Sequence, residues 1–365
     1  MLLWLAVLML PWRPWRCREV LEADEGASKM GLGDITTLIP ARNEEDTIGA
    51  VLDGLKRQGG GLAVVLIDDE STDGTRQVAL DAMEGITIVN GTAPPEGWSG
   101  KLWALEQGLA HVHTPLILLL DADIELKAGM LAALAGKLRR ERLAMVSLMA
   151  APNMVRVWEK ALMPAFVYFF KLVYPFSLSN RPGSGVAAAA GGCALLETRM
   201  LPETGGFAAI RSAIIDDCTL AARIKSLDRP IWIGLTHAAM SRRSSSLADL
   251  GNMVARTAFT QLHYSLMLLI GCTVAFVTIF GLPVAGLFLP GRAFFLSLAI
   301  VVAMSTSYLP ILRFYARSPL WVLALPLIAG WYLAMTWLSA FRYWHGERSR
   351  WKGRSYMRPD SGRVV

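Results

Sequence analysis

The sequence predicts an α/β protein with a mostly parallel sheet, followed by C-terminal transmembrane helices. Between Ile35 and about Val146, short apolar runs alternate with segments of helical periodicity. Such alternation is typical of a parallel sheet that is covered by helices on both faces. Residues 262–341, in contrast, are almost free of charge, and the whole chain is 53% hydrophobic with a mean hydropathy of +0.40. A chain of 365 residues has room for a soluble unit and a membrane unit.

The alternating region contains four predicted strands and four predicted helices. We expect the strands at "ITTLIP" (35–40), "LAVVLIDDES" (62–71), "GITIVNG" (85–91) and "PLILLLDADIEL" (115–126). We expect the helices at 44–58, 74–83, 101–112 and 129–142. Ligands of such sheets bind beyond the carboxyl ends of the strands, and the main polar clusters of this chain fall at those ends.

Apolar segments outside this region indicate a membrane protein. The N-terminal segment 1–18 begins "MLLWLAVLMLP", which is short for a crossing of about 20 residues, so it is either a truncated anchor or an interfacial one. Residues 158–179 are aromatic and apolar, and we expect them to lie in the membrane interface, with a core helix as the alternative. Three stretches long enough to span a bilayer follow, at 262–289, 293–312 and 320–341.

Charge and cysteine content predict the location. The net charge is +6, and the tail at 342–365 is rich in Lys and Arg, so we expect it to face the anionic cytoplasmic leaflet rather than nucleic acid. The four cysteines form no CxxC pair, which suits a reducing cytosolic face. We therefore expect a multi-pass protein of the inner (cytoplasmic) membrane with its α/β domain in the cytosol. Three crossings would leave the tail outside, so the sequence leaves open whether one segment is re-entrant.

Polar clusters follow the first two predicted strands. "PARNEE" (40–45) follows the first strand, and its Asn43 and Glu44 could equally cap the next helix. "IDDESTDGT" (67–75) follows the second strand, where Asp69 can accept a hydrogen bond from a nucleobase or ribose. A solvated loop is the alternative for this second cluster.

A third cluster, "GWSGKLWALEQG" (97–108), places a lysine at the start of a predicted helix. Backbone N–H groups at a helix start, together with the positive charge of Lys101, can bind a diphosphate. A surface lysine at a helix end is an equally good interpretation of this cluster taken alone.

The fourth cluster is "DAD" (121–123), directly after an apolar run. We expect both carboxylates to point the same way from an extended strand end. Two close acids repel each other and lose solvation there, so either a metal or water and backbone N–H groups must offset the cost. Oxygen ligands of this kind suit Mg²⁺ or Mn²⁺ that is shared with phosphate oxygens.

In this order, the four clusters resemble the family 2 glycosyltransferases, which have a nucleotide-diphosphosugar-binding GT-A fold. The resemblance continues in "GGCALLE" (191–197), "GGF" (205–207) and "IIDDCTLAARI" (214–224), and covers residues 35 to about 260. The whole chain looks closest to the hopene-associated glycosyltransferases. It implies a short N-terminal membrane anchor at 1–18, a GT-A domain at 30–260, transmembrane helices at 262–341 and a basic tail at 342–365.

The resemblance also implies roles for individual residues. The donor would contact Pro40, Asn43, Glu44, Asp69, Lys101 and Asp121. Asp121 and Asp123 would hold Mg²⁺ or Mn²⁺. Asp217 would be the catalytic base, although the family usually has Glu-Asp where this chain has Asp216–Asp217. The QxxRW motif of processive synthases is missing, since "MVARTA" (253–258) keeps only Arg256, which argues against a polysaccharide synthase.

The activity implied is that of a membrane-bound, inverting, metal-dependent transferase. It would move a sugar from a nucleotide diphosphate sugar, a UDP-sugar in our interpretation, to a membrane lipid acceptor, in hopanoid metabolism if the narrower resemblance holds. Two alternatives stay open: a polyprenyl-phosphate glycosyltransferase, and a non-catalytic nucleotide-sugar-binding membrane scaffold. A transporter is disfavoured because the apolar stretches lack intramembrane charges.

Overall fold

The computed structural model describes residues 2–24, 26, 31–351 and 354–357. The predicted start of the α/β domain at Met30 and much of the predicted basic tail lie outside the described residues. The chain divides into two compact units. The sheet unit comprises Arg18–Asn153 and Tyr174–Ser244, and the helical unit comprises Met1–Cys17, Met154–Val173 and Ser245–Val365.

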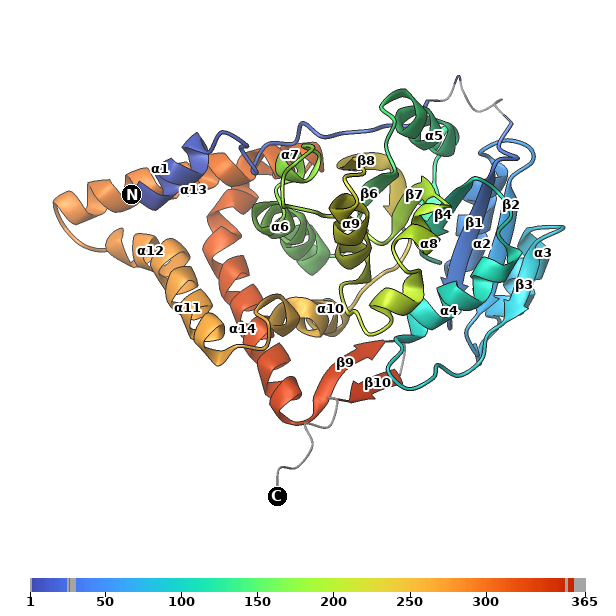
Figure 1. The fold of residues 1–365 in the computed structure, drawn as a ribbon. Helices are drawn as coiled ribbons and strands as arrows, with labels where there is room; N and C mark the ends of the chain where they lie inside the picture. Colours follow the sequence, from blue (N-terminus) through green and yellow to red (C-terminus); the bar gives the residue numbers. More distant parts are fainter. Residues whose placement is uncertain (1, 25, 27–30, 352–353, 358–365) are drawn as a thin grey trace. The chain divides into compact units, whose positions relative to one another are not determined.

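The sheet unit contains eight strands in the order β3-β2-β1-β4-β7-β6-β8-β5 (Figure 1). Strands β3, β2, β1 and β4 pair in parallel, β6 pairs in parallel with β8, and the pairs β4–β7, β6–β7 and β5–β8 are antiparallel. The α/β class is therefore confirmed, with a mixed sheet that has a parallel half. The strands are β1 (Ile35–Ala41), β2 (Ala63–Asp68), β3 (Thr87–Asn90), β4 (Leu116–Leu120), β5 (Ile124–Leu126), β6 (Met145–Ala151), β7 (Cys193–Glu197) and β8 (Ile231–Ser241).

The prediction of a single fourth strand over 115–126 was wrong. Strand β4 ends at Leu120, a turn follows at 121–123, and β5 begins at Ile124. Strand β5 then pairs with β8, with Ile124 opposite Ser241, rather than continuing beside β1. The two carboxylates of "DAD" therefore lie in a turn between two strands with different partners.

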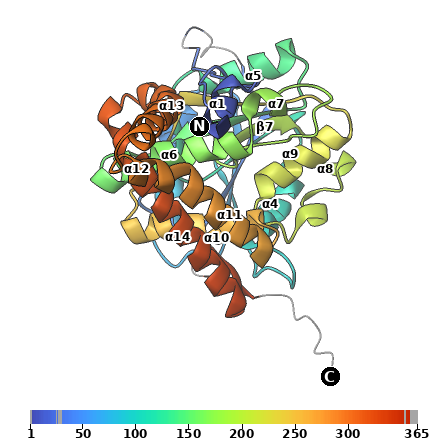
Figure 2. The ribbon, with the colours of Figure 1, turned by 90° about the vertical axis from the view of Figure 1, so that its left-hand side faces the viewer.

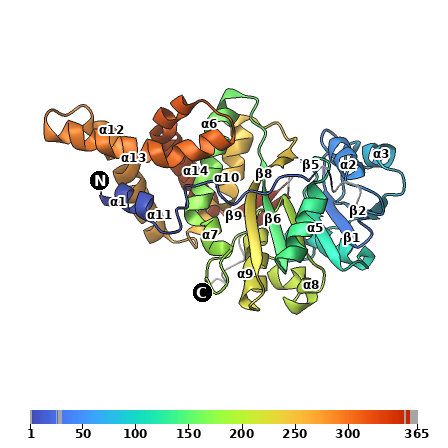
Figure 3. The ribbon, with the colours of Figure 1, turned by 90° about the horizontal axis from the view of Figure 1, so that it is seen from above.

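Apolar side chains cover both faces of the sheet. Successive residues of a strand point to opposite faces, and on β4 Leu118 packs with one apolar cluster while Ile117 packs with the other. Strands buried on both faces read as near-continuous apolar runs, which explains the sequence of β4. The helices of this unit are α2 (Ile48–Lys56), α3 (Thr75–Ala82), α4 (Gly100–Gly108), α5 (Met130–Arg140), α7 (Phe176–Ser179), α8 (Met200–Glu203) and α9 (Asp216–Ser226). Helices α2 and α3 lie side by side (Figure 3).

The helical unit contains three helices that are long and apolar enough to cross a membrane, among the residues described. They span Leu266–Gly286, Arg292–Phe314 and Pro319–Trp344. Large apolar side chains on them are exposed, such as Met267 at 82% and Leu327 at 80%, and an exposed apolar surface of this kind marks contact with a membrane or a partner. The helices of this unit are α1 (Leu2–Met9), α6 (Val157–Val173), α10 (Leu247–Gln261), α11 (Leu266–Phe276), α12 (Leu282–Gly286), α13 (Arg292–Phe314) and α14 (Leu325–Trp344), followed by strands β9 (Glu347–Trp351) and β10 (Arg354–Met357).

Short segments distant in sequence pack onto these long helices. Helix α14 runs beside α10 and α11 (Figure 2). Helix α1 rises only about 12 Å over its eight residues, too little to cross a bilayer core of about 30 Å. Its Trp4 is buried and donates a hydrogen bond from Nε1 to the carbonyl of Ile279 at 3.2 Å. The predicted short anchor thus packs within the helical unit.

Helix α6 covers most of the segment that we expected in the membrane interface. It packs against α13 and α14. The hydroxyl groups of Tyr168 and Ser307 share a hydrogen bond at 2.7 Å, and Tyr332 Oη donates to the carbonyl of Leu162 at 2.8 Å. Buried hydroxyl groups need such partners, so α6 is an integral part of the helical unit, whereas residues 174–179 belong to the sheet unit.

Candidate functional site

The candidate site lies where the carboxyl ends of β1, β2 and β4 meet the first turns of α4 and α9. Ser99 caps α4, because its Oγ accepts a hydrogen bond from the Leu102 N–H at 3.4 Å, and this fixes Lys101 in the first helical turn. Asp216 and Asp217 open α9, where carboxylates complement the helix dipole. Because ligands of α/β sheets bind beyond the carboxyl ends of the strands, a substrate is expected to bind at this edge.

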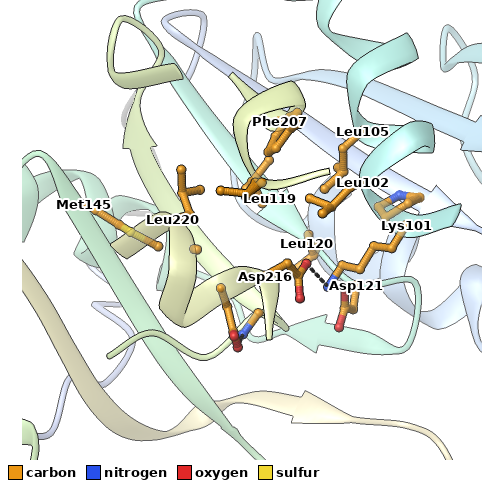
Figure 4. A pocket seen from close by; sticks show the side chains of 15 residues that line it. Lys101, Leu102, Leu105, Leu119, Leu120, Asp121, Met145, Phe207, Asp216 and Leu220 are labelled. Carbon is orange, nitrogen blue, oxygen red and sulfur yellow. Dashed lines mark hydrogen bonds and ion pairs between the residues drawn. The ribbon is translucent and has the colours of Figure 1, made fainter. Parts of the chain in front are cut away.

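Lys101 extends toward Asp121 and Asp216 (Figure 4). Its Nζ lies 2.7 Å from Asp121 Oδ1 and 3.8 Å from Asp216 Oδ2. Burial alone would lower the pKa of Lys101, but the nearby carboxylates outweigh burial and hold this pKa well above its usual value. Burial also raises the pKa of Asp121, and the ammonium of Lys101 opposes that rise. Lys101 therefore stays charged and offsets the cost of placing acids at the strand end.

Asp217 is held by backbone groups. Its Oδ2 accepts a hydrogen bond from the Gly191 N–H at 2.7 Å, and its Oδ1 accepts one from the Cys218 N–H at 2.7 Å. Burial, and next the charge of Asp216, raise the pKa of Asp217 from 3.8 to about 6. A Cβ atom at position 191 would lie 3.3 Å from both Asp217 Oδ2 and Lys101 Nζ, so glycine permits the close approach of β7 to these two side chains.

These residues line a small cavity of about 20 Å³, enough for about one water molecule. Its wall is apolar and includes Leu102, Leu105 and Phe207 (Figure 4). Pro40 of the first cluster also lines it. The low polarity of this wall explains why burial is the largest influence on the pKa of Asp217.

The two acids of "DAD" have different partners. Asp121 pairs with Lys101, whereas Asp123 accepts a hydrogen bond from Ser241 Oγ at 2.7 Å and lies 3.5 Å from Arg243 Nε. We expected both side chains to leave an extended strand end in the same direction, and this was wrong because residues 121–123 form a turn. The charges of Asp121 and Asp123 still interact, since Asp123 contributes to the raised pKa of Asp121.

Arg243 connects the first and fourth sequence clusters. Its guanidinium lies 2.6 Å from Glu44 Oε1 as well as near Asp123. Glu44 is only 8% exposed and also accepts a hydrogen bond from Thr47 Oγ1 at 3.1 Å. A buried carboxylate needs such partners, so Glu44 organises the edge of the sheet in this structure.

The remaining predicted residues lie in the two loops after β1 and β2. Asn43 has a left-handed backbone with φ of 52°, and its Oδ1 accepts a hydrogen bond from the Thr72 N–H at 2.8 Å. Asp69 is fully buried, and its carbonyl oxygen accepts a hydrogen bond from Arg42 at 2.5 Å. The two loops are thus bound to each other and form one rigid rim beside the Lys101 cluster.

The donor atoms at this edge fit a divalent cation in their chemistry. Asp121, Asp123, Asp216 and Asp217 carry four carboxylates, against the two cations Lys101 and Arg243. Oxygen ligands with excess negative charge suit Mg²⁺ or Mn²⁺, which typically take one or two protein carboxylates and complete their shell with water and substrate phosphates. Among the described residues, no three His, Cys, Asp or Glu side chains are arranged as a preformed metal site.

Two contributors were not assigned a place in this cluster from the sequence. Asp216 faces Lys101, although only its neighbour Asp217 was given a role. Ser241, at the end of β8, binds Asp123. The preference of acids for the first turn of a helix could have indicated Asp216, because it opens α9, but no local pattern relates residue 241 to residue 123.

The sheet unit is similar in sequence to one protein family. Residues 36–205 match the sequence model of the family described as Glycosyl transferase family 2. The matched segment is 170 residues long, a little under half of the chain. It includes Lys101, Asp121 and Asp123, and ends before Asp217.

Two individual proteins show further similarity. The chain is 40% identical over 91 residues to the 4,4'-diaponeurosporenoate glycosyltransferase of Staphylococcus aureus. This match covers 25% of the chain and spans about a quarter, 24%, of that relative's length. The mannosyltransferase PcManGT of Pyrobaculum calidifontis, solved with GDP-Man and Mn²⁺, has a TM-score of 0.54 at 18% identity, and the match covers 92% of this chain and 94% of the other. At that identity the likeness shows the shared GT-A-type fold.

Proposed function

We propose that this protein is a membrane-bound, inverting glycosyltransferase that moves a sugar from a nucleotide diphosphate sugar to a lipid hydroxyl group. The observation that carries the proposal is the cluster in which Lys101, Asp121, Asp216 and Asp217 meet within a family 2 domain. It combines a charged ammonium, candidate metal ligands and a carboxylate with a raised pKa. These are the groups that sugar transfer from a diphosphate requires.

The donor would lie across the mouth of the cavity, because the cavity itself is too small for a nucleotide. Lys101 would contact the diphosphate and stabilise the negative charge that develops on it as the sugar leaves. Asp121 and Asp123 would hold Mg²⁺ or Mn²⁺, which when bound supplies Lewis-acid stabilisation of the same oxygens. Pro40, Asn43, Glu44 and Asp69 would form the rim on the nucleoside side.

Asp217 is the proposed base. With a pKa of about 6 it is ionised at neutral pH, yet it is more basic than an ordinary aspartate. Its two backbone hydrogen bonds fix the orientation of the carboxylate, and each oxygen keeps a lone pair. It would take the proton of the acceptor hydroxyl as that oxygen attacks the anomeric carbon from the face opposite the diphosphate. This geometry inverts the anomeric configuration.

A lipid acceptor is proposed from two observations. The chain has three helices suited to a membrane among the described residues, and the name of the Staphylococcus aureus relative, 4,4'-diaponeurosporenoate glycosyltransferase, suggests a lipid-related acceptor. We place the protein in the inner membrane as a multi-pass protein, with the family 2 domain in the cytosol, where nucleotide sugars are made. A UDP-sugar as donor and a hopanoid as acceptor are the narrowest form of the proposal.

The test is nucleoside diphosphate release by the detergent-purified full-length protein. A panel of UDP- and GDP-sugars would be offered with Mn²⁺ or Mg²⁺, with and without bacterial lipid extract, and the glycolipid product would be identified by mass spectrometry. We expect release that needs lipid and metal and is lost in Asp123→Ala and Asp217→Asn. The exposed surface variant Asp81→Asn is the matched control and should keep full activity.

Two results would replace the proposal by its alternatives. Release that survives in Asp217→Asn would indicate an acceptor that is already anionic, such as a polyprenyl phosphate, because such an acceptor needs little base catalysis. Binding of a nucleoside diphosphate without release from any donor would indicate a non-catalytic scaffold.

A further inference from the structure

A second pocket lies at the opposite edge of the sheet from the family 2 site. It has a volume of about 470 Å³, within the range of about 300–1,000 Å³ that is usual for small-molecule sites. Asp34 and Pro115 precede β1 and β4, Ala144 and Pro230 precede β6 and β8, and Glu197 ends the antiparallel β7. The pocket is therefore built at the amino-terminal edge of the parallel strands, away from Lys101.

Backbone hydrogen bonds make this edge rigid. The Glu197 N–H donates to the Ala144 carbonyl at 3.0 Å, and the Ala144 N–H donates to the Pro230 carbonyl at 2.8 Å. The Thr198 N–H donates to the Pro115 carbonyl at 2.9 Å. Adjoining segments are thus fixed to one another, and a ligand would meet a preorganised floor rather than a flexible loop.

Four arginines surround the floor. Arg139 lies in the last turn of α5, Arg142 follows that helix, Arg199 follows β7, and Arg229 precedes β8. Two of them are neutralised, because Arg139 pairs with Asp34 and Arg199 binds Glu197 through both Nε and Nη2, at 3.0 and 2.8 Å. The pocket thus contains four guanidinium groups and only two carboxylates.

The other two arginines are available to a ligand. Arg142 is exposed and forms no ion pair with any residue that the structure describes, and Arg229 has only a long contact of 3.8 Å with Glu203. Guanidinium groups present a planar set of donors that matches phosphate oxygens. The rest of the lining is apolar, with Leu116, Leu138 and Leu143. These leucines are almost fully buried, so a ligand would be recognised chiefly through the arginines.

We infer that this pocket is a second ligand site, which binds a phosphorylated compound through Arg142 and Arg229. The inference is independent of the proposed sugar transfer, because none of these residues belongs to the Lys101 cluster. The phosphate group could belong to a soluble metabolite or to the head group of an anionic lipid, and the experiment separates these two sources.

The test measures pyrophosphate binding by calorimetry on the full-length protein in detergent, at fixed ionic strength and without divalent metal. Removing a charge-assisted hydrogen bond costs about 1.5–3 kcal/mol, so Arg142→Gln combined with Arg229→Gln should weaken binding at least about tenfold. Arg140→Gln is the control, since Arg140 is the last residue of α5, lies two residues before Arg142 and does not line the pocket. The control removes one positive charge, so Arg142→Gln and Arg229→Gln are also measured singly against it. Circular dichroism would verify that all variants fold.

The variant Lys101→Met distinguishes pyrophosphate binding at the second pocket from binding at the Lys101 cluster. Binding that persists in Lys101→Met and Arg140→Gln but weakens in the double variant supports the site. Binding that disappears in Lys101→Met, or that weakens equally in the double variant and Arg140→Gln, overturns it. Absence of saturable binding in the unmodified protein also overturns it.

The source of the phosphate is tested in nanodiscs. If phosphatidylglycerol in the disc weakens pyrophosphate binding relative to discs of phosphatidylcholine alone, the pocket binds a lipid head group. If the affinity is the same in both discs, it binds a soluble phosphate compound. Both outcomes support the site, provided that the difference between the double variant and Arg140→Gln is kept.

Discussion

The pH dependence of turnover tests the role of Asp217 directly. With a pKa of about 6, roughly 90% of Asp217 is ionised at pH 7 and roughly 9% at pH 5. A rate that needs the ionised carboxylate should therefore fall about tenfold between pH 7 and pH 5. With the ordinary pKa of 3.8, roughly 94% would still be ionised at pH 5, and the rate would hardly change.

The neighbouring acid provides the decisive variant. The negative charge of Asp216 raises the pKa of Asp217, so Asp216→Asn should move the acidic midpoint of the rate to lower pH. Asp81→Asn, on the exposed side of α3, should leave the midpoint where it is. The assay is kcat for nucleoside diphosphate release at saturating donor, acceptor and metal, with donor binding measured separately at each pH.

The reasoning would be refuted by an acidic midpoint near pH 4 in the unmodified protein. It would also be refuted by an identical midpoint in Asp216→Asn. A fall in donor affinity with unchanged kcat would assign the pH dependence to the donor-binding residues instead.

Three further results are expected. Lys101→Met should lower kcat/KM by roughly 10²–10³ and weaken nucleoside diphosphate binding, while the exposed Lys56→Met should change neither, as steady-state kinetics and calorimetry would show. Arg243→Gln leaves the buried Glu44 without one of its partners, so the free energy of unfolding should fall by about 1–2 kcal/mol. Denaturant titrations would measure this change, and the free energy of unfolding should fall less in Arg243→Lys, which keeps the positive charge. Mn²⁺ binding followed by electron paramagnetic resonance in the presence of a nucleoside diphosphate should be strongly weakened by Asp123→Ala, and equal affinity in the two proteins would exclude Asp123 as a ligand.

The parallel half of the fold could be predicted from the sequence because its signals are local. Strands β1 and β2 coincide with apolar runs of the sequence, and the run "LILLL" predicts that β4 is buried on both faces. The Lys101 cluster could be anticipated for the same reason, since residues at the carboxyl ends of parallel strands converge. The α/β class and the order of these elements were therefore correct.

The antiparallel half depends on contacts between residues far apart in the chain. Nothing in "LILLLDADIEL" shows that the chain turns at 121–123, because the turn is stabilised by the pairing of Ile124 with Ser241. The contact of Arg243 with Glu44 joins residues 199 positions apart. Composition likewise indicated an apolar segment at 158–179 but could not show that the Tyr168 hydroxyl would bind Ser307.

The division of the chain into two units has a consequence for biosynthesis. The helical unit is assembled from three separate stretches of sequence, and the sheet unit from the two stretches between them. During translation, α6 leaves the ribosome before α13 and α14, whose side chains satisfy Tyr168 and the Leu162 carbonyl. All residues of the sheet unit have been made once Ser244 is reached, whereas the helical unit needs the C-terminal helices as well, and no single cut in the gene would release either one as a continuous polypeptide. A soluble form of the sheet unit would therefore need 154–173 replaced by a linker in addition to truncation on both sides of 18–244.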